Sequence, residues 1–389
     1  MVVERLAPFQ VNIFAKMSAL AASLGAVNLG QGFPDEDGPP AMLEVARQAI
    51  ADGINQYPPG LGIAELRRAI CAQRLRRYGQ EFDPDGEVLV TVGASEAIAS
   101  AVIGLVEPGS EVLLIEPYFD TYAPNIAMAG AHRVSVPLVP DGRGFALDAD
   151  AVRAAITPRT RAMIVNSPHN PTGMVLTDAE CAALAEVAVE ADLLVISDEV
   201  YERLTFDGRT HLPLASYRGM AQRTVTISSA AKMFNCTGWK IGWACGPTEL
   251  VNGVRAAKQY LSYVGGAPFQ PAVAYALDNE DAWADSLRDS LQTKRDRLAS
   301  ALTEIGFDVH DSAGTYFLCA DPRPIGVDDG AAFCEELPRR VGVAAIPMSA
   351  FCDPGRTPDQ WRHLVRFAFC KRDATLDEAI DRLGKLSPS

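Results

Sequence analysis

Short apolar runs rich in β-branched residues recur along the first two thirds of the chain. They predict strands at residues 87–93, 111–116, 161–166, 193–197 and 224–228. Between them lie helical patterns rich in alanine and leucine, such as residues 94–106 and 178–191. Strands that alternate with helices form a mostly parallel sheet with helices on both faces. The pattern therefore predicts an α/β domain built in layers.

The pattern changes from about residue 279 onward. One long charged helix is predicted over residues 281–305, and strands follow near 307–309, 316–319 and 364–369, which indicates a second, smaller α/β unit. The first forty residues carry one amphipathic helix and a loop rich in glycine and proline, which is too little for a domain. We expect this N-terminal segment, 1–40, to pack on the second unit or on a partner subunit, beside a large domain of residues 41–285 and a small domain of residues 286–389.

Composition narrows the classes of function. The 389 residues are 48% hydrophobic, and 49 acidic residues outnumber 35 basic ones to give a net charge of −14. Proteins that bind nucleic acid or anionic membranes need a basic face, so neither class is expected. Small-molecule chemistry is favoured instead.

Cysteine and histidine patterns indicate neither disulfides nor a metal site. The eight cysteines form no CxxC pair, the five histidines show no metal-ligand spacing, and the motifs GxxxxGK[ST], HExxH and GxSxG are missing. The chain starts without a secretory apolar run, and no stretch reaches about 18 uninterrupted apolar residues. We expect an unprocessed, soluble, cytoplasmic protein with reduced thiols and no metal.

Lys232 is the first candidate for chemistry. It follows a predicted strand in the segment ISSAAKMFNCTGWK, residues 227–240, among small, apolar and hydroxyl-bearing residues. Such surroundings disfavour the ammonium form, and a lysine with a lowered pKa can form a Schiff base with an aldehyde cofactor. The alternative is a structural lysine whose stem is buried while its amine reaches water. Ser229 and Lys240 add a hydroxyl and a cation that could hold a phosphate.

Three more segments lie at strand ends, where α/β sheets bind their ligands. The segment NSPHNPTG, residues 166–173, could fix Asn170 with its amide at the sheet edge, or it could be an ordinary loop. Asp198 follows an apolar run, where a carboxylate needs a cation or a donor, or could act as a helix N-cap. The turn at Gly93–Ser95 offers backbone N–H groups to an anion, as many strand-to-helix turns do.

Together these segments resemble the class I aminotransferases of pyridoxal phosphate fold type I, over nearly the whole chain. NLGQGFP, residues 28–34, is similar to the branch that contains kynurenine aminotransferase and glutamine transaminase K. Within that branch, SSAAKMFNCTGW (228–239) and YVGGAPFQ (263–270) most resemble the actinobacterial N-succinyldiaminopimelate aminotransferases. The resemblance implies a fold type I enzyme, with a large domain whose mostly parallel seven-stranded sheet lies between helices and a smaller α/β C-terminal domain.

The resemblance also implies pyridoxal 5′-phosphate as the cofactor. Lys232 would hold it as the internal aldimine and, once displaced by substrate, would move a proton between the substrate α-carbon and the cofactor. Asp198 would pair with the protonated ring nitrogen, while Asn170 and Tyr201 would hydrogen-bond the ring oxygen. The phosphate would be bound by Gly93, Ala94, Ser95, Ser229 and Lys240.

Two aromatic residues acquire a role only through the resemblance. Phe119 matches the ring that stacks on the cofactor, and in isolation it would be a core aromatic. Tyr57 matches a tyrosine that reaches the phosphate of the neighbouring subunit, which implies a homodimer with shared active sites. In isolation Tyr57 would be an ordinary loop residue.

Arg366 lies in an apolar strand pattern, on the opposite face from Val365 and Phe367, and an arginine there needs an anionic partner. The alternative to a ligand is a surface arginine paired with an aspartate. The resemblance makes the partner the substrate α-carboxylate, held as a bidentate pair. It also implies that Gly32 closes the substrate pocket and that Phe14 lies near the substrate side chain.

The implied activity is transamination between amino acids and 2-oxo acids by a ping-pong cycle. The leading hypothesis is an N-succinyl-L,L-diaminopimelate:2-oxoglutarate aminotransferase of lysine and diaminopimelate biosynthesis. Kynurenine aminotransferases carry an aromatic residue and a histidine near the segment that reads YVGG here, residues 263–266, so an aromatic preference is not favoured. The alternatives are a broad glutamine, kynurenine and methionine-oxo-acid transaminase with β-lyase side activity on cysteine S-conjugates, a C–S lyase, and a non-catalytic DNA-binding regulator.

Overall fold

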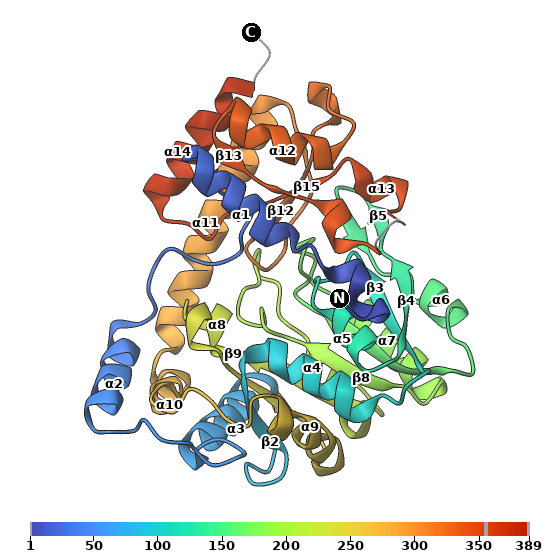
Figure 1. Ribbon diagram of the computed structural model, residues 1–389, viewed down its shortest axis with the longest axis vertical. Coiled ribbons are helices and arrows are strands. Elements are labelled where there is room, and N and C mark those ends of the chain that lie inside the picture. Colours follow the sequence, from blue (N-terminus) through green and yellow to red (C-terminus); the bar gives the residue numbers. More distant parts are fainter. Residues whose placement is uncertain (1, 354–356, 387–389) are drawn as a thin grey trace.

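The computed structural model describes residues 2–353 and 357–386. Its central sheet has seven strands in the order β2-β10-β9-β8-β7-β3-β4 (Figure 1). Only β10 runs antiparallel to its neighbours, so the predicted mostly parallel sheet is confirmed. In chain order the strands are β2 (Val88–Val92), β3 (Glu111–Glu116), β4 (His132–Pro137), β7 (Thr160–Asn166), β8 (Leu194–Asp198), β9 (Thr224–Ser229) and β10 (Ile241–Cys245).

Helices cover both faces of this sheet, and its inner strands are therefore apolar on both sides. One face packs on α4 (Gly93–Leu105), α5 (Tyr122–Met128) and α9 (Thr248–Leu261). The other packs on α2 (Pro40–Ala51), α3 (Ala64–Tyr78), α7 (Asp178–Glu190) and α10 (Phe269–Asn279), with α6 (Ala149–Ala154) next to α7. α7 begins with a capping box in which Thr177 and Glu180 satisfy each other's backbone N–H groups.

The C-terminal part builds a second, four-stranded antiparallel sheet in the order β11-β12-β15-β14. Its strands are β11 (Asp308–Val309), β12 (Phe317–Asp321), β14 (Ile346–Pro347) and β15 (Val365–Ala368). Four helices accompany it, α11 (Asp281–Ile305), α12 (Gly330–Arg340), α13 (Asp359–Arg362) and α14 (Asp373–Leu383). The predicted domain border at residues 285 and 286 falls inside α11, and the domain limits stay a prediction.

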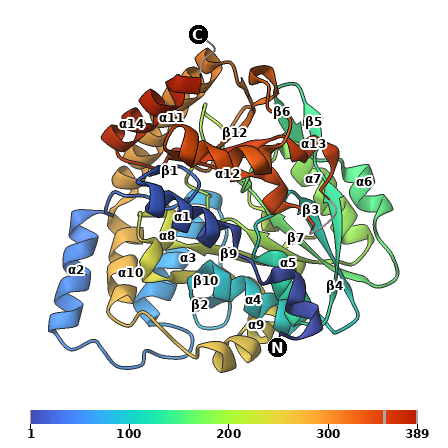
Figure 2. The ribbon, with the colours of Figure 1, turned by 45° about the horizontal axis from the view of Figure 1, so that its top comes forward.

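The N-terminal segment lies with the C-terminal elements. Helix α1 (Ile13–Leu24) lies beside α12 in two views of the ribbon (Figures 1 and 2), and β1 (Val27–Asn28) pairs in parallel with β13 (Val343–Ala344). A 3-10 turn at Glu4–Phe9 precedes α1 and packs near α5. Helix α1 and strand β1 therefore build one end of the molecule together with the C-terminal elements, while the residues before α1 lie on the large domain.

Two strands of the central sheet have no counterpart among the predicted apolar runs. β4 reads HRVSVP and lies at the sheet edge, where polar residues alternate with apolar ones. β10 reads IGWAC, and it is short and contains a glycine. Gly242 of β10 is required there, because a Cβ at this position would come within 2.5 Å of the carbonyl carbon of Gly93.

A buried ion cluster lies next to the end of β8. The guanidinium of Arg74 on α3 contacts Glu199 at 3.0 Å and Glu202 at 2.9 Å, and these side chains are at most 1% exposed. Glu202 also accepts a hydrogen bond from Ser228 of β9 at 2.6 Å. Because buried carboxylates are costly without a cation, this cluster fixes the backbone that follows Asp198.

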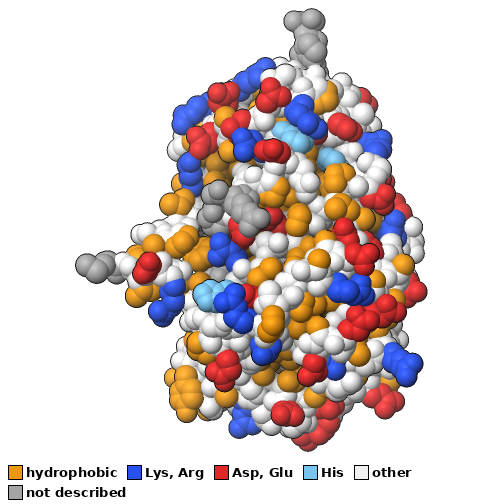
Figure 3. Space-filling model, turned by 90° about the vertical axis from the view of Figure 1, so that its right-hand side faces the viewer, with side chains coloured by type: hydrophobic (Ala, Val, Ile, Leu, Met, Phe, Trp, Pro, Cys, Tyr) orange, Lys and Arg blue, Asp and Glu red, His pale blue; other side chains and the backbone are white. Residues whose placement is uncertain are grey.

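Two further observations concern the surface and the helices. On the face shown in Figure 3, basic and acidic side chains are interspersed and no basic patch stands out. Among the described residues, no helix has both the length and the apolar character needed to cross a membrane.

Candidate active site

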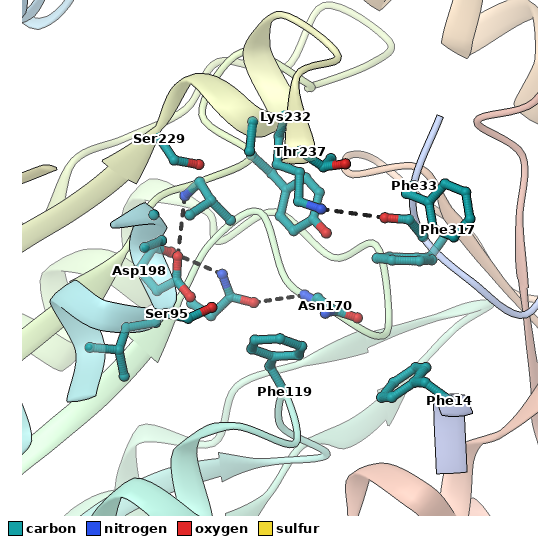
Figure 4. Close-up of a pocket in the computed structure, with 18 of the residues that line it drawn as sticks. Phe14, Phe33, Ser95, Phe119, Asn170, Asp198, Ser229, Lys232, Thr237 and Phe317 are labelled. Carbon is teal, nitrogen blue, oxygen red and sulfur yellow. Dashed lines mark hydrogen bonds between the residues drawn. The ribbon is translucent and has the colours of Figure 1, made fainter. Parts of the chain in front are cut away.

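A cavity of about 310 Å³ lies at the carboxyl ends of the central strands, against the second sheet. Strand register places its polar residues together: Asn166 is paired with Asp198, and Asp198 with Ile227 of β9. The cavity brings together every predicted site residue except Tyr57, namely Phe14, Gly32, Gly93, Ala94, Ser95, Phe119, Asn170, Asp198, Tyr201, Ser229, Lys232, Lys240 and Arg366. Figure 4 shows Lys232 and Ser229 on one side of it, and Phe119 and Phe14 on the other.

Lys232 lies in the short helix α8 (Ala230–Met233), directly after β9. Its Nζ contacts the hydroxyl of Tyr316 at 2.6 Å and the carbonyl oxygen of Gly32 at 3.3 Å. The surrounding protein removes water from the ammonium and lowers the pKa of Lys232 from 10.5 to about 8. Roughly a tenth of this amine is therefore uncharged and nucleophilic at pH 7, far more than for a lysine with the ordinary pKa.

Asp198 is buried at the end of β8. Its carboxylate accepts hydrogen bonds from the Tyr122 hydroxyl at 2.6 Å and from the backbone of Val200 at 3.3 Å, and it has no ion pair within the described part of the chain. Burial raises the pKa of Asp198 from 3.8 to about 6, although the bond from Tyr122 opposes the rise. A buried carboxylate with donors but no cation is suited to a cationic group of a ligand.

The turn from β2 into α4 forms an anion-binding corner. Gly93 has φ +71°, and a Cβ on it would lie 3.1 Å from Nζ of Lys240. Helix α4 begins at this glycine with Ala94 and Ser95 in its first turn, and Ser229 lines the same cavity. Backbone N–H groups, hydroxyls and one ammonium thus converge here, as a phosphate requires.

Arg366 lies in β15, between β12 and β14, and is 1% exposed. Its guanidinium donates to Oδ1 of Asn170 at 2.8 Å and to the carbonyl oxygen of Gly30 at 2.9 Å, and it stacks on Phe317 at 3.8 Å from the ring centre. Its Nε has no partner, and no carboxylate pairs with it among the described residues. Burial lowers the pKa of Arg366 to about 10, so a buried cation faces the cavity without an anion.

Aromatic rings close the cavity around Arg366. Phe14 lies edge-on to Phe351 with 5.7 Å between ring centres, and both rings lie over the guanidinium. Gly32 is tightly packed, since a Cβ there would come within 2.4 Å of the Phe317 ring. The glycine that the resemblance placed at the pocket therefore lies where no larger residue fits.

Tyr57 lies outside this cavity. It is 82% exposed and packs edge-on against Tyr263 with 5.6 Å between ring centres. Its predicted contact with a neighbouring subunit is not tested by a single chain.

Sequence reasoning missed several cavity residues, namely Gln31, Phe33, Ile98, Tyr122, Asn166, Val200, Ala231, Thr237 and Phe317, and also Tyr316, which contacts Lys232. Some stood inside motifs already singled out: Asn166 opens the segment that contains Asn170, and its Oδ1 accepts from the Asn170 backbone at 2.7 Å. Tyr316 and Phe317 gave no signal, because only tertiary packing brings β12 to Lys232.

Comparison with known proteins identifies the family. The model of the family "Aminotransferase class I and II" matches residues 25–383. The chain belongs to this family. Its members depend on pyridoxal phosphate, and the lysine, the unpaired buried carboxylate and the anion-binding corner described above fit that cofactor.

Individual aminotransferases match along the whole chain. The structure of N-succinyldiaminopimelate aminotransferase from Mycobacterium tuberculosis is 73% identical, with a TM-score of 0.98 over 99% of this chain and 100% of that one. The methionine aminotransferase of Escherichia coli K12 is 38% identical over 98% of both chains. Kynurenine–oxoglutarate transaminase 3 of Rattus norvegicus is 37% identical over 97% of this chain and 88% of its own.

Proposed function

We propose that this aminotransferase is an N-succinyl-L,L-diaminopimelate:2-oxoglutarate aminotransferase of lysine and diaminopimelate biosynthesis, working in the cytoplasm. The assignment of the substrate rests on the 73% identity, over 99% of the chain, to the N-succinyldiaminopimelate aminotransferase of M. tuberculosis. The buried guanidinium of Arg366 supports an α-amino acid substrate, because no anion lies beside it among the described residues. In the cycle, an amino donor leaves its nitrogen on the enzyme and a 2-oxo acid collects it.

Bound pyridoxal phosphate supplies an electron sink for the electron pair left at the substrate α-carbon. Lys232 binds the cofactor and later holds the proton that leaves this carbon. Asp198, which accepts a hydrogen bond from Tyr122, would keep the ring nitrogen protonated. The phosphate would be held by Gly93, Ala94, Ser95, Ser229 and Lys240, which line the same cavity.

Asn170 has two roles that its geometry makes compatible. Its Oδ1 accepts from Arg366 at 2.8 Å, which leaves the amide nitrogen as a donor for the ring oxygen of the cofactor. Tyr201 would donate to the same oxygen, and Phe119 would lie against the ring. Asn170 thus connects the cofactor site with the substrate site.

Arg366 binds the substrate α-carboxylate as a bidentate pair, and the Gly32 backbone closes the pocket over it. Phe14 lies beside the substrate side chain. Asn170, Gly30 and the Phe317 ring hold the Arg366 side chain in place before any ligand binds. The entropy cost of ordering this side chain on substrate binding is therefore small.

A homodimer with shared active sites is part of this proposal. Tyr57 and Tyr260 are 82% and 86% exposed, so both rings are free to contact a second subunit. Tyr57 then reaches the phosphate in the partner's site. Light scattering should give twice the chain mass of 41.7 kDa.

A broad transaminase is the second candidate, and one observation favours it. The only basic side chains among the cavity's lining residues are Lys232, Lys240 and Arg366, so no described cation is left for the distal carboxylates of a succinylated substrate. The rings of Phe14 and Phe33, which also line the cavity, suit an apolar side chain such as that of methionine.

One assay separates the two candidates. The purified enzyme receives 2-oxoglutarate with N-succinyl-L,L-diaminopimelate, L-kynurenine, L-glutamine or L-methionine, and glutamate release is measured. We expect the succinylated substrate to lead by roughly tenfold or more in kcat/KM, equivalent to about 1.4 kcal/mol. Equal or better rates with the other amino acids make the enzyme a broad transaminase, and pyruvate release from cysteine S-conjugates without glutamate makes it a C–S lyase.

A further inference from the structure

Tyr316 lies against the reactive amine but has no role in the site described so far. It comes directly before β12, is 1% exposed, and its hydroxyl lies 2.6 Å from Nζ of Lys232. The same hydroxyl is hydrogen-bonded to the carbonyl oxygen of Gly32, which also accepts a hydrogen bond from Nζ of Lys232 at 3.3 Å. One phenol thus connects the lysine to the loop that closes the substrate pocket.

The direction of these hydrogen bonds is fixed by chemistry. The Gly32 carbonyl can only accept, so the Tyr316 hydroxyl donates to it and receives an N–H of Lys232 on its own oxygen. Burial raises the pKa of Tyr316 well above its usual value, so the side chain stays a phenol. Tyr316 therefore supplies Lys232 with an acceptor that does not change with pH in the working range.

Packing holds the Tyr316 ring in this position. It meets Tyr201 edge-on at 5.2 Å and Phe317 at 4.8 Å between ring centres. Its carbonyl accepts from the backbone of Phe369 at 3.0 Å, and a Cβ on Gly32 would come within 2.8 Å of its ring. The hydroxyl is consequently placed by rigid surroundings.

We propose that Tyr316 is a positioning residue for Lys232, whose hydroxyl holds the free amine beside the pocket whenever the lysine is not linked to the cofactor. The proposal rests on the proposed function. A lysine stem has several rotatable bonds, and fixing its end removes alternative positions from which proton transfer fails. Other groups whose charge acts on the Lys232 amine are Asp198, Cys370, Arg366 and Lys240.

Tyr316→Phe tests this role, because it keeps the packed ring and removes only the hydroxyl. Holoenzyme is assayed with L-glutamate and with α-deuterated L-glutamate. We expect kcat to fall roughly 10- to 100-fold with KM within about twofold, and the deuterium isotope effect on kcat to rise, since proton transfer becomes slower than the other steps. Tyr217→Phe is the matched control, since it removes a phenol bonded to Asp178 near the surface.

A second measurement does not depend on turnover. Cofactor-free protein is mixed with pyridoxal phosphate over a range of pH, and the rate at which the visible absorbance band forms reports the fraction of uncharged Lys232. The wild-type midpoint should lie near the lowered pKa of about 8. Removing an acceptor of the ammonium N–H should lower the midpoint by roughly one unit in Tyr316→Phe and leave it unchanged in Tyr217→Phe.

Each result decides the proposal. Unchanged kcat, isotope effect and pH midpoint in Tyr316→Phe would overturn it. So would a higher KM with an unchanged kcat, because the hydroxyl would then serve only the Gly32 loop. If the wild-type enzyme transaminates no amino acid, the proposed function fails, and the pH midpoint still decides whether Tyr316 acts on Lys232.

Discussion

Replacing Arg366 is the most direct test of how substrate is held. Guanidinium has five N–H donors, and the bonds to Asn170 and Gly30 use two of them, so three remain, including the unpaired Nε–H. A substrate carboxylate takes two donors and neutralises a buried charge. Losing a buried, charged, bidentate contact costs roughly 2 to 5 kcal/mol, which corresponds to a fall in kcat/KM of roughly 30- to 5000-fold.

The assay compares Arg366→Ala and Arg366→Lys with the wild type on several amino acids of different side chain. We expect a similar proportional loss for every one of them, because all share the α-carboxylate. Arg366→Lys should fall between wild type and Arg366→Ala, since an ammonium keeps the charge but not the planar pair of donors. Arg47→Ala is the control, because Arg47 is exposed and pairs only with Glu44.

Loss of Arg366 also removes a partner from Asn170, so cofactor binding is measured in parallel through the visible absorbance. The reasoning about the α-carboxylate is refuted if only one amino acid is affected. It is refuted equally if kcat/KM falls no further than cofactor occupancy does.

Three further changes test other parts of the structure. Burial lowers the pKa of Lys232 from 10.5 to about 8, so the buried ammonium destabilises the cofactor-free fold below pH 8, and this cost disappears as the pH rises towards 10.5. Lys232→Met should therefore raise the free energy of unfolding in urea at pH 7 by up to about 3 kcal/mol, and by less at pH 10. Arg74→Met leaves Glu199 and Glu202 buried without their arginine, with Nε2 of His211 at 3.0 Å from Glu199, and should lower the stability measured by thermal denaturation by about 3 to 5 kcal/mol. Tyr57→Phe should weaken cofactor binding roughly tenfold, followed by fluorescence titration, without changing the mass found by light scattering.

Each of these expectations has an opposite result. If the increase in the free energy of unfolding of Lys232→Met does not shrink with rising pH, it is due to packing and not to the lysine charge. An Arg74→Met protein as stable as the wild type means that water or another group serves the two carboxylates. If Tyr57→Phe retains full cofactor affinity, the hydroxyl does not reach a phosphate in the partner's site.

The sequence predicted those parts of the fold that have strong local patterns. The strand at Glu111–Glu116 and the helix at Asp281–Ile305 lie where the apolar periodicity placed them. β4 was missed because an edge strand needs few apolar residues, and β10 because close packing on Gly93 requires a glycine within a short run. The apolar pattern of the sequence thus identified strands with apolar faces, but not β4 and β10, whose positions depend on tertiary packing.

The same distinction holds for the site. Asp198 could be singled out because it directly follows an apolar run, and Lys232 because it lies shortly after a strand among small, apolar and hydroxyl-bearing residues. Tyr122 was not selected, since its bond to Asp198 joins residues that only the folded sheet brings together. For Tyr316 the sequence offered no signal, as its contact with Lys232 depends on how β12 packs against the large sheet.

The position of β10 has a consequence for how the chain is synthesised. Its residues follow those of β2 and β9 in the chain, yet β10 pairs between them and is the only link between the two strands in the sheet. Until residue 245 has left the ribosome, β2 has no partner strand, so the corner at Gly93 is not hydrogen-bonded through the sheet to the strand that precedes Lys232. Pairing of this one short antiparallel strand completes the sheet between the two parts of the cofactor site, and its residues are made well before the strand that carries Arg366.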